Sequence, residues 1–162
     1  MLMSQLDPGD DIAPGSYCEE VRRLADYWRH IHPADGLPGR QHLDPLDIPD
    51  LLPNVWLVDV HRSPWRFRVR LIGTAIVSFV GADHTGQWMH EVFPGFESTS
   101  AYSDLVTCAA DGHPVACTAR LVSNPERTHV RAQRIHLPLA TDGRTPDMIL
   151  SAGSLNHLRR WQ

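Results

Sequence analysis

The sequence contains no lysine, and its 15 basic side chains are all arginines spread along 162 residues. With 19 acidic residues, the formal net charge is −4 and the pI is near 6.2. A nucleic-acid-binding domain usually carries a basic excess that is clustered on one face, so this composition predicts no nucleic-acid partner. The even spread of the arginines favours a compositional bias over selection for anion binding.

Long apolar runs and cysteine pairs are also missing. No stretch approaches the ~20 apolar residues that cross a bilayer, and the acidic start of the chain lacks the apolar segment of a signal peptide. Cys18, Cys108 and Cys117 are an odd, widely spaced set, which predicts free thiols in a reducing compartment. We therefore expect a cytoplasmic protein with no membrane partner.

The sequence holds no familiar arrangement of metal ligands or catalytic residues. Ten histidines are present, but no Cys-x-x-Cys or His-Glu-x-x-His spacing occurs. No Gly-x-Ser-x-Gly elbow and no glycine-rich phosphate loop is found either. We expect neither a metal site nor an enzyme.

An alternating strand that runs into two short helices is the most informative pattern present. Phe67, Val69 and Leu71 alternate with arginines, which is typical of a half-buried strand. A short helical pattern then ends at Gly81, and a second one follows Gly86. The expected strands span residues 54–60, 66–73, 115–123, 129–139 and 147–155, and a longer helix spans 98–111. This order predicts an α+β fold, a five-stranded antiparallel sheet with helices covering one face.

The beginning of the chain predicts a disordered leader followed by an extra amphipathic helix. Residues 1–15 form the leader, and Ser16 with Glu19 resembles a capping box that opens a helix over 16–32. An apolar stripe follows at helical spacing: Tyr17, Val21, Leu24, Trp28 and Ile31. We expect this helix to cross the outer face of the sheet, with its acidic residues over the arginines of residues 66–70. The stripe packs on its own domain, or it also contacts a second copy in a homodimer.

The strand, Gly73-Thr74-Ala75, the one-turn helix and its closing glycine together resemble the front half of a PAS domain. Residues 37–60 narrow the resemblance to a family of small, often stand-alone bacterial PAS proteins. The resemblance covers residues 27–153 and assigns 33–158 to the PAS domain. It implies a sensory or regulatory module that binds a small molecule or a protein partner and signals through contacts with another protein.

Some PAS domains bind haem or a flavin, so the resemblance makes both cofactors candidates. A haem would need a histidine in the helical region, where His84, His90 and His113 lie. Flavin photochemistry needs an Asn-Cys-Arg-Phe-Leu-Gln type motif, and nothing here matches it. We expect neither cofactor.

The space between sheet and helices is the expected ligand pocket. Its predicted residues are Trp56, Val58, Val69, Leu71, Phe79, Trp88, Tyr102, Leu105, Val106 and Arg131. Arg131 would suit a carboxylate only if a polar strip of the fourth strand enters the pocket, and we favour a bulge near Gln133 that turns this strip away. Two alternatives stay open. One is a small cone-shaped isomerase or dehydratase, for which no buried aspartate is evident, and the other is a ligand-free interaction scaffold.

Overall fold

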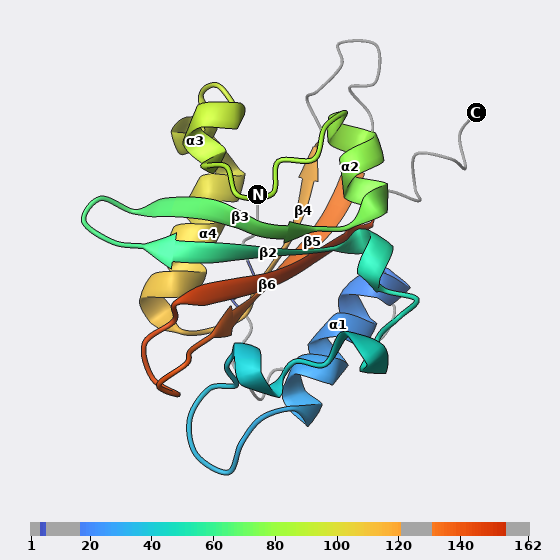
Figure 1. The fold of residues 1–162 in the computed structure, drawn as a ribbon, viewed down its shortest axis with the longest axis vertical. Coiled ribbons are helices and arrows are strands. Elements are labelled where there is room, and N and C mark those ends of the chain that lie inside the picture. Colours follow the sequence, from blue (N-terminus) through green and yellow to red (C-terminus); the bar gives the residue numbers. More distant parts are fainter. Residues whose placement is uncertain (1–3, 6–16, 121–130, 155–162) are drawn as a thin grey trace.

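A computed structural model describes residues 4–5, 17–120 and 131–154, and an antiparallel sheet forms its centre (Figure 1). The strands lie in the order β1-β4-β5-β6-β2-β3. They span Ser4–Gln5 (β1), Val55–His61 (β2), Arg66–Ile72 (β3), Val115–Arg120 (β4), Arg131–Leu139 (β5) and Met148–Ser154 (β6). The five longer strands confirm the predicted sheet, and β1 adds a two-residue sixth strand within the predicted leader.

Four α-helices and several 3₁₀ turns complete the described chain. The helices are α1 (Glu19–His30), α2 (Thr74–Val80), α3 (Met89–Val92) and α4 (Ser100–Asp111). The 3₁₀ turns are η1 (Arg40–His42), η2 (Pro45–Asp47), η3 (Leu52–Asn54) and η4 (Phe96–Ser98). None of the helices in these ranges has both the length and the apolar character needed to cross a bilayer.

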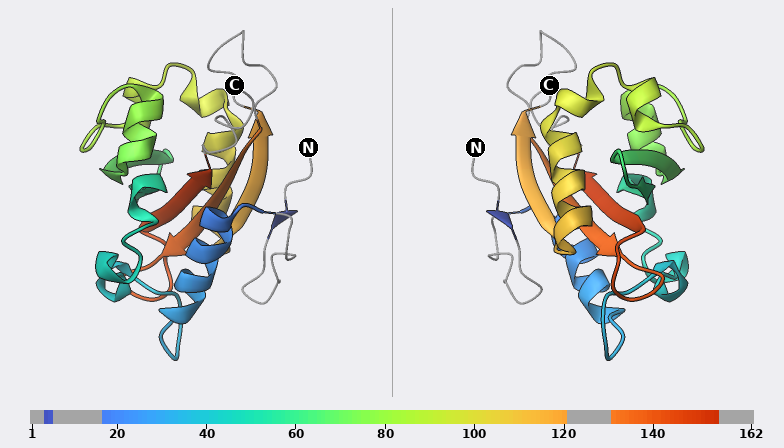
Figure 2. Two further views of the ribbon diagram at one scale, coloured as in Figure 1. Left: turned by 90° about the vertical axis from the view of Figure 1, so that its right-hand side faces the viewer. Right: turned by 90° about the vertical axis from the view of Figure 1, so that its left-hand side faces the viewer.

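Helices cover both faces of the sheet, since the extra N-terminal helix lies on the outer face as predicted. α1 packs on β5 and β6 from one side, and α4 packs on β4, β5 and β6. Figure 2 shows the strands between α1 and the pair α2 and α3. Two separate apolar clusters result, because alternate side chains of a strand point to opposite faces. Leu57, Ile135 and Leu137 belong to the α1 cluster, whereas Val58 and Ile149 belong to the other.

The apolar stripe of α1 is buried against the sheet of its own chain. Val21 and Leu24 are 0% exposed and Trp28 is 1% exposed, and Tyr17 and Ile31 pack on the same cluster. Each fully buried side chain of this kind contributes about 1.5–3 kcal/mol. The helix therefore crosses the outer face as predicted, while a homodimer remains a prediction.

The start of α1 and its charged residues differ from the sequence prediction. The helix begins at Glu19 with Cys18 at its N-cap, and Ser16 lies outside the described residues. Glu19 and Asp26 pair with Arg23 and Arg29 of the same helix, and the helix packs on β5 and β6 instead of lying over the arginines of β3. Arg23 bonds Asp50 through both nitrogens of its fork, and Arg70 of β3 instead lies 3.7 Å from Asp59 of β2.

A β-bulge in β3 corrects the predicted orientation of its end. Leu57 pairs with Leu71 but Val58 pairs with Val69, so Arg70 has no partner of its own across the ladder. The extra residue reverses the alternation that follows it. Leu71 therefore lies on the outer face, opposite Leu57, and is 39% exposed, whereas Ile72 takes the inner face opposite Trp56.

Gly73 connects β3 to α2 at a close approach of two backbone segments. A Cβ at this position would lie 2.3 Å from the carbonyl oxygen of Leu52 and 2.4 Å from that of Pro53. Backbone atoms cannot move aside as a flexible side chain can. The requirement for glycine here is therefore steric, since its φ of −69° is open to any residue.

We predict that Gly73→Ala lowers the free energy of unfolding by about 1–3 kcal/mol, the usual cost of forced overpacking. Urea denaturation monitored by circular dichroism measures the change. Ser78→Ala, at an exposed position of α2, is the control and should stay within about 0.5 kcal/mol of the wild type. Equal stability of Gly73→Ala and the control would contradict the close approach of 52–53 to residue 73.

Candidate functional site

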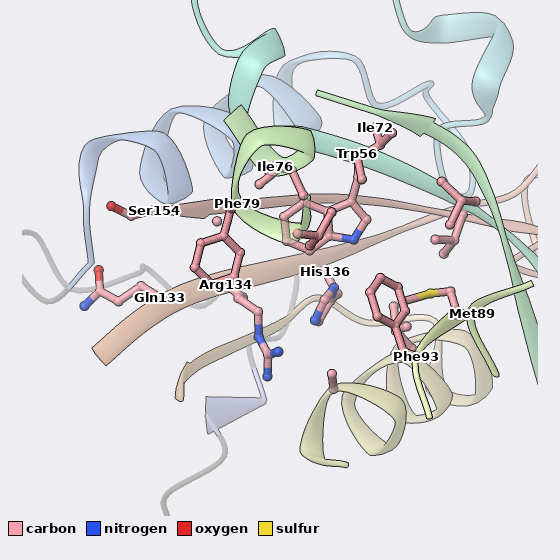
Figure 3. A pocket seen from close by; sticks show the side chains of 16 residues that line it. Trp56, Ile72, Ile76, Phe79, Met89, Phe93, Gln133, Arg134, His136 and Ser154 are labelled. Carbon is pink, nitrogen blue, oxygen red and sulfur yellow. The ribbon is translucent and has the colours of Figure 1, made fainter. Parts of the chain in front are cut away.

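A cavity of about 180 Å³ lies between the inner face of the sheet and the helices (Figure 3). The sheet contributes one wall through β2, β3, β5 and β6, and α2, α3 and α4 contribute the other. The lining residues are Trp56, Val58, Val69, Ile72, Ile76, Phe79, Val80, Met89, Phe93, Ala101, Leu105, Gln133, Arg134, His136, Gly153 and Ser154. Most of this wall is apolar, which is typical of small-molecule pockets.

The structure brings half of the predicted pocket residues together. Trp56, Val58, Val69, Phe79 and Leu105 all line the cavity, and their contact with a ligand remains a prediction. Arg131 belongs to β5, but its side chain lies outside the described residues. Leu71 is excluded by the bulge in β3.

Trp88, Tyr102 and Val106 also do not line the cavity. Trp88 forms an isolated bridge with Arg68 on the outer edge of β3, and its ring packs edge-on against His61 at 4.8 Å. The hydroxyl of Tyr102 donates to the carbonyl oxygen of Trp65 at 3.2 Å, which holds the ring beside the β2–β3 hairpin. Val106 packs on the apolar cluster that contains Val58 and Leu105, but it does not line the cavity.

The polar end of the cavity comes from β5, which has no bulge. Its pairing with β4 is regular from Arg131 to His136, and its pairing with β6 is regular from Gln133 to Leu139. The predicted bulge near Gln133 is therefore wrong. Ile135 and Leu137 face α1, and the residues that alternate with them, Arg134 and His136, face the cavity.

His136 is a buried imidazole with one unused nitrogen. Its side chain is 1% exposed, and Nδ1 lies 2.7 Å from the hydroxyl oxygen of Ser151. Among the described residues, Nε2 has no hydrogen-bond partner. Burial first, and the positive charge of Arg134 second, lower the pKa of His136 from 6.5 to about 3. The imidazole is therefore neutral at physiological pH.

Arg134 and Asp104 form a buried ion pair that sequence analysis missed. Asp104 of α4 is 0% exposed, and its Oδ2 lies 3.5 Å from an Nη of Arg134. Both carboxylate oxygens of Asp104 and the Nε of Arg134 lack hydrogen-bond partners within the described ranges. The expectation that no aspartate is buried is therefore wrong. Asp104 lies three residues after Ala101 and four before Cys108, so helical spacing alone places it on the buried face.

The cysteines near this ion pair are packing residues. All three cysteines are free. Burial raises the pKa of the Cys108 thiol well above its ordinary value. It also raises that of Cys117, whose sulfur lies 3.5 Å from an Nη of Arg134. A thiol with a raised pKa carries little thiolate, so neither residue is an activated nucleophile.

The Ser151 and His136 pair is a poor catalytic dyad despite its short contact. A general base works best when its pKa is near the operating pH, and that of His136 is about 3. Ser151 is fully buried and does not line the cavity. The geometry supports recognition of a bound group better than nucleophilic attack on it.

Comparison with known proteins assigns the chain to a family. A family model for the PAS domain matches residues 18–155, and the chain therefore belongs to the PAS domain family. PAS domains are sensory and regulatory modules, which agrees with the function class expected from the sequence. No curated protein matches the chain.

A structure search finds similarity to a solved protein described as an RNA-binding light-oxygen-voltage receptor. The sequence identity is 18% and the TM-score is 0.46. The match covers 75% of this chain but 36% of the receptor, so the chain spans about a third of that protein's length.

We predict that His136 makes the protein less stable as the pH falls below 6.5. Its folded pKa is depressed, so the unfolded chain binds the proton first, and acid favours unfolding. This one group should remove about 1.5 kcal/mol of stability between pH 6.5 and pH 5.

Urea denaturation at several pH values measures this slope. His136→Gln should have a flatter dependence on pH by that amount, whereas His30→Gln, at an exposed position of α1, should retain the wild-type slope. Equal slopes for all three proteins would show that the imidazole is not held neutral.

Proposed function

We propose that the protein is a sensor that binds a small organic molecule in the cavity between the sheet and α2–α4. The observation that carries this proposal is an apolar cavity with two polar atoms at one end, His136 Nε2 and Arg134 Nε, that have no hydrogen-bond partner in the part of the chain that the structure describes. Buried polar atoms without partners are costly. A ligand that forms hydrogen bonds with these atoms removes that cost. Its binding is further stabilised by the burial of its apolar part.

The size of the cavity supports a ligand of about one ring. A dry cavity of about 150 Å³ is enough to hold benzene, and the cavity here is about 180 Å³. Haem and flavins are much larger than one ring. We therefore propose a small metabolite in place of either cofactor.

The route from cavity to surface runs through the central strands. In β5, Arg134 and His136 face the cavity while Ile135 and Leu137 contact the cluster under α1. The indole nitrogen of Trp28 also donates to the carbonyl oxygen of Pro138 at 2.9 Å. Ligand binding would shift the balance between two packings of this strand and α1. A signalling protein would then read the change on the exposed side of α1.

We predict that filling the cavity abolishes ligand binding. Ala101 lines the cavity from α4, whereas Ala110 of the same helix is exposed. Mass spectrometry under native and denaturing conditions should detect a small molecule that co-purifies with the wild type and with Ala110→Phe. Ala101→Phe should lose it, because the added ring takes the ligand's space.

Hydrogen exchange tests the signalling part of the proposal separately. Removal of the bound molecule should change the exchange of the Glu19–His30 amides at least threefold. Unchanged exchange in α1 would exclude this route, and retention of the molecule by Ala101→Phe would place its binding site elsewhere.

A further inference from the structure

If the cavity binds a small molecule, as proposed above, the polar residues at its end indicate the chemical class of that ligand. The guanidinium of Arg134 has five N–H donors in a planar fork. The described contacts of this group are the ion pair with Asp104 at 3.5 Å and a contact with the sulfur of Cys117 at 3.5 Å. Both use Nη2, while the buried Nε–H has no partner among the described residues. Most of the fork is therefore available to a ligand.

His136 provides a second donor beside this fork, if the proton of its neutral ring is on Nε2. If the hydroxyl of Ser151 donates to Nδ1, the one unsatisfied group of the pair is the Nε2–H. If Nδ1–H donates instead, both the Ser151 proton and the Nε2 lone pair are left without a described partner. The first arrangement leaves fewer buried groups unsatisfied and is favoured. His136 then presents an N–H to the cavity.

The guanidinium of Arg134 places a positive charge at this end of the cavity. Arg134 lines the cavity, whereas its counter-ion Asp104 lies behind it and does not. Figure 3 shows the side chains of Arg134 and His136 on the cavity side of β5. They are two residues apart on one strand, and two such residues lie about 7 Å apart along it. An acidic group between them can reach both donors.

We propose that Arg134 and His136 bind the carboxylate of a ligand whose apolar body, of about one ring, fills the rest of the cavity. The arginine fork suits the two oxygens of a carboxylate, and His136 Nε2–H donates to one of them. The opposite wall, formed by Ile76, Phe79 and Phe93, contacts the ring. Asp104 holds the guanidinium in place in the empty site and keeps that site neutral.

Titration calorimetry on the full chain with benzoate and benzamide tests this proposal. The two probes share a ring and a planar head group, but only benzoate carries a charge at pH 7. We expect benzoate to bind the wild type at least about tenfold more tightly, because charge-assisted hydrogen bonds are roughly twice as strong as neutral ones.

The matched variants separate charge from fold. Asp104→Asn with Arg134→Gln replaces the ion pair by an uncharged pair and leaves no buried charge alone. This double variant should weaken benzoate binding about 10- to 100-fold and change benzamide binding less than about threefold. Arg70→Gln removes one positive charge from an exposed side chain of β3 and should change neither affinity.

Any of three results would contradict the proposal. Equal affinity of the wild type for both probes, or full retention of benzoate affinity by the double variant, would show that the cavity does not select a carboxylate. In both cases the proposed small-molecule sensor would still stand if the wild type binds benzamide and Ala101→Phe does not. Absence of binding by either probe at millimolar concentration would count against the carboxylate ligand, and the co-purification experiment above decides the sensor function independently.

Discussion

Strand β5 has to satisfy two different environments at once, and the rest of the structure depends on this constraint. Side chains of a strand alternate between faces with a period of two, and here both faces are covered. Ile135, Leu137 and Leu139 form part of the core under α1, so the residues that alternate with them point to the other face of the sheet. Arg134 and His136 thus lie in the second layer, where the sheet and α4 leave a cavity.

The buried polar residues of the second layer are tolerated because each charged or polar side chain has at least one partner inside the protein. Arg134 has a counter-ion in Asp104, and His136 has a hydroxyl partner in Ser151. Among the described residues, Arg134 Nε and His136 Nε2 remain without a hydrogen-bond partner, and both of these residues line the cavity. These atoms would orient a ligand in the proposed site, because an apolar wall alone would not fix its orientation.

The fold was largely predictable from sequence, and the polar end of the cavity was not. Alternation and glycine positions locate all five longer strands, because these signals are local. The bulge at Arg70 is not visible in the sequence pattern, because the alternation of Phe67 and Val69 before it is unchanged. Only after the bulge does Ile72 take the inner face in place of Leu71. Asp104 was overlooked although it lies in the buried helical stripe, because a charged residue is rarely buried without a partner. That partner, Arg134, is distant in sequence.

The two edges of the sheet determine how this domain can associate with other proteins. At one edge, β1 pairs with Val115 and Ala116 of β4. At the other, the amide of Val69 donates to Gln87, and its carbonyl accepts from Gly86. Backbone groups at an open edge invite strand addition by another chain, and these positions are already occupied by the protein itself. Association at these positions would require displacement of the chain's own segments, which favours contacts through helices and side chains over a continuous intermolecular sheet.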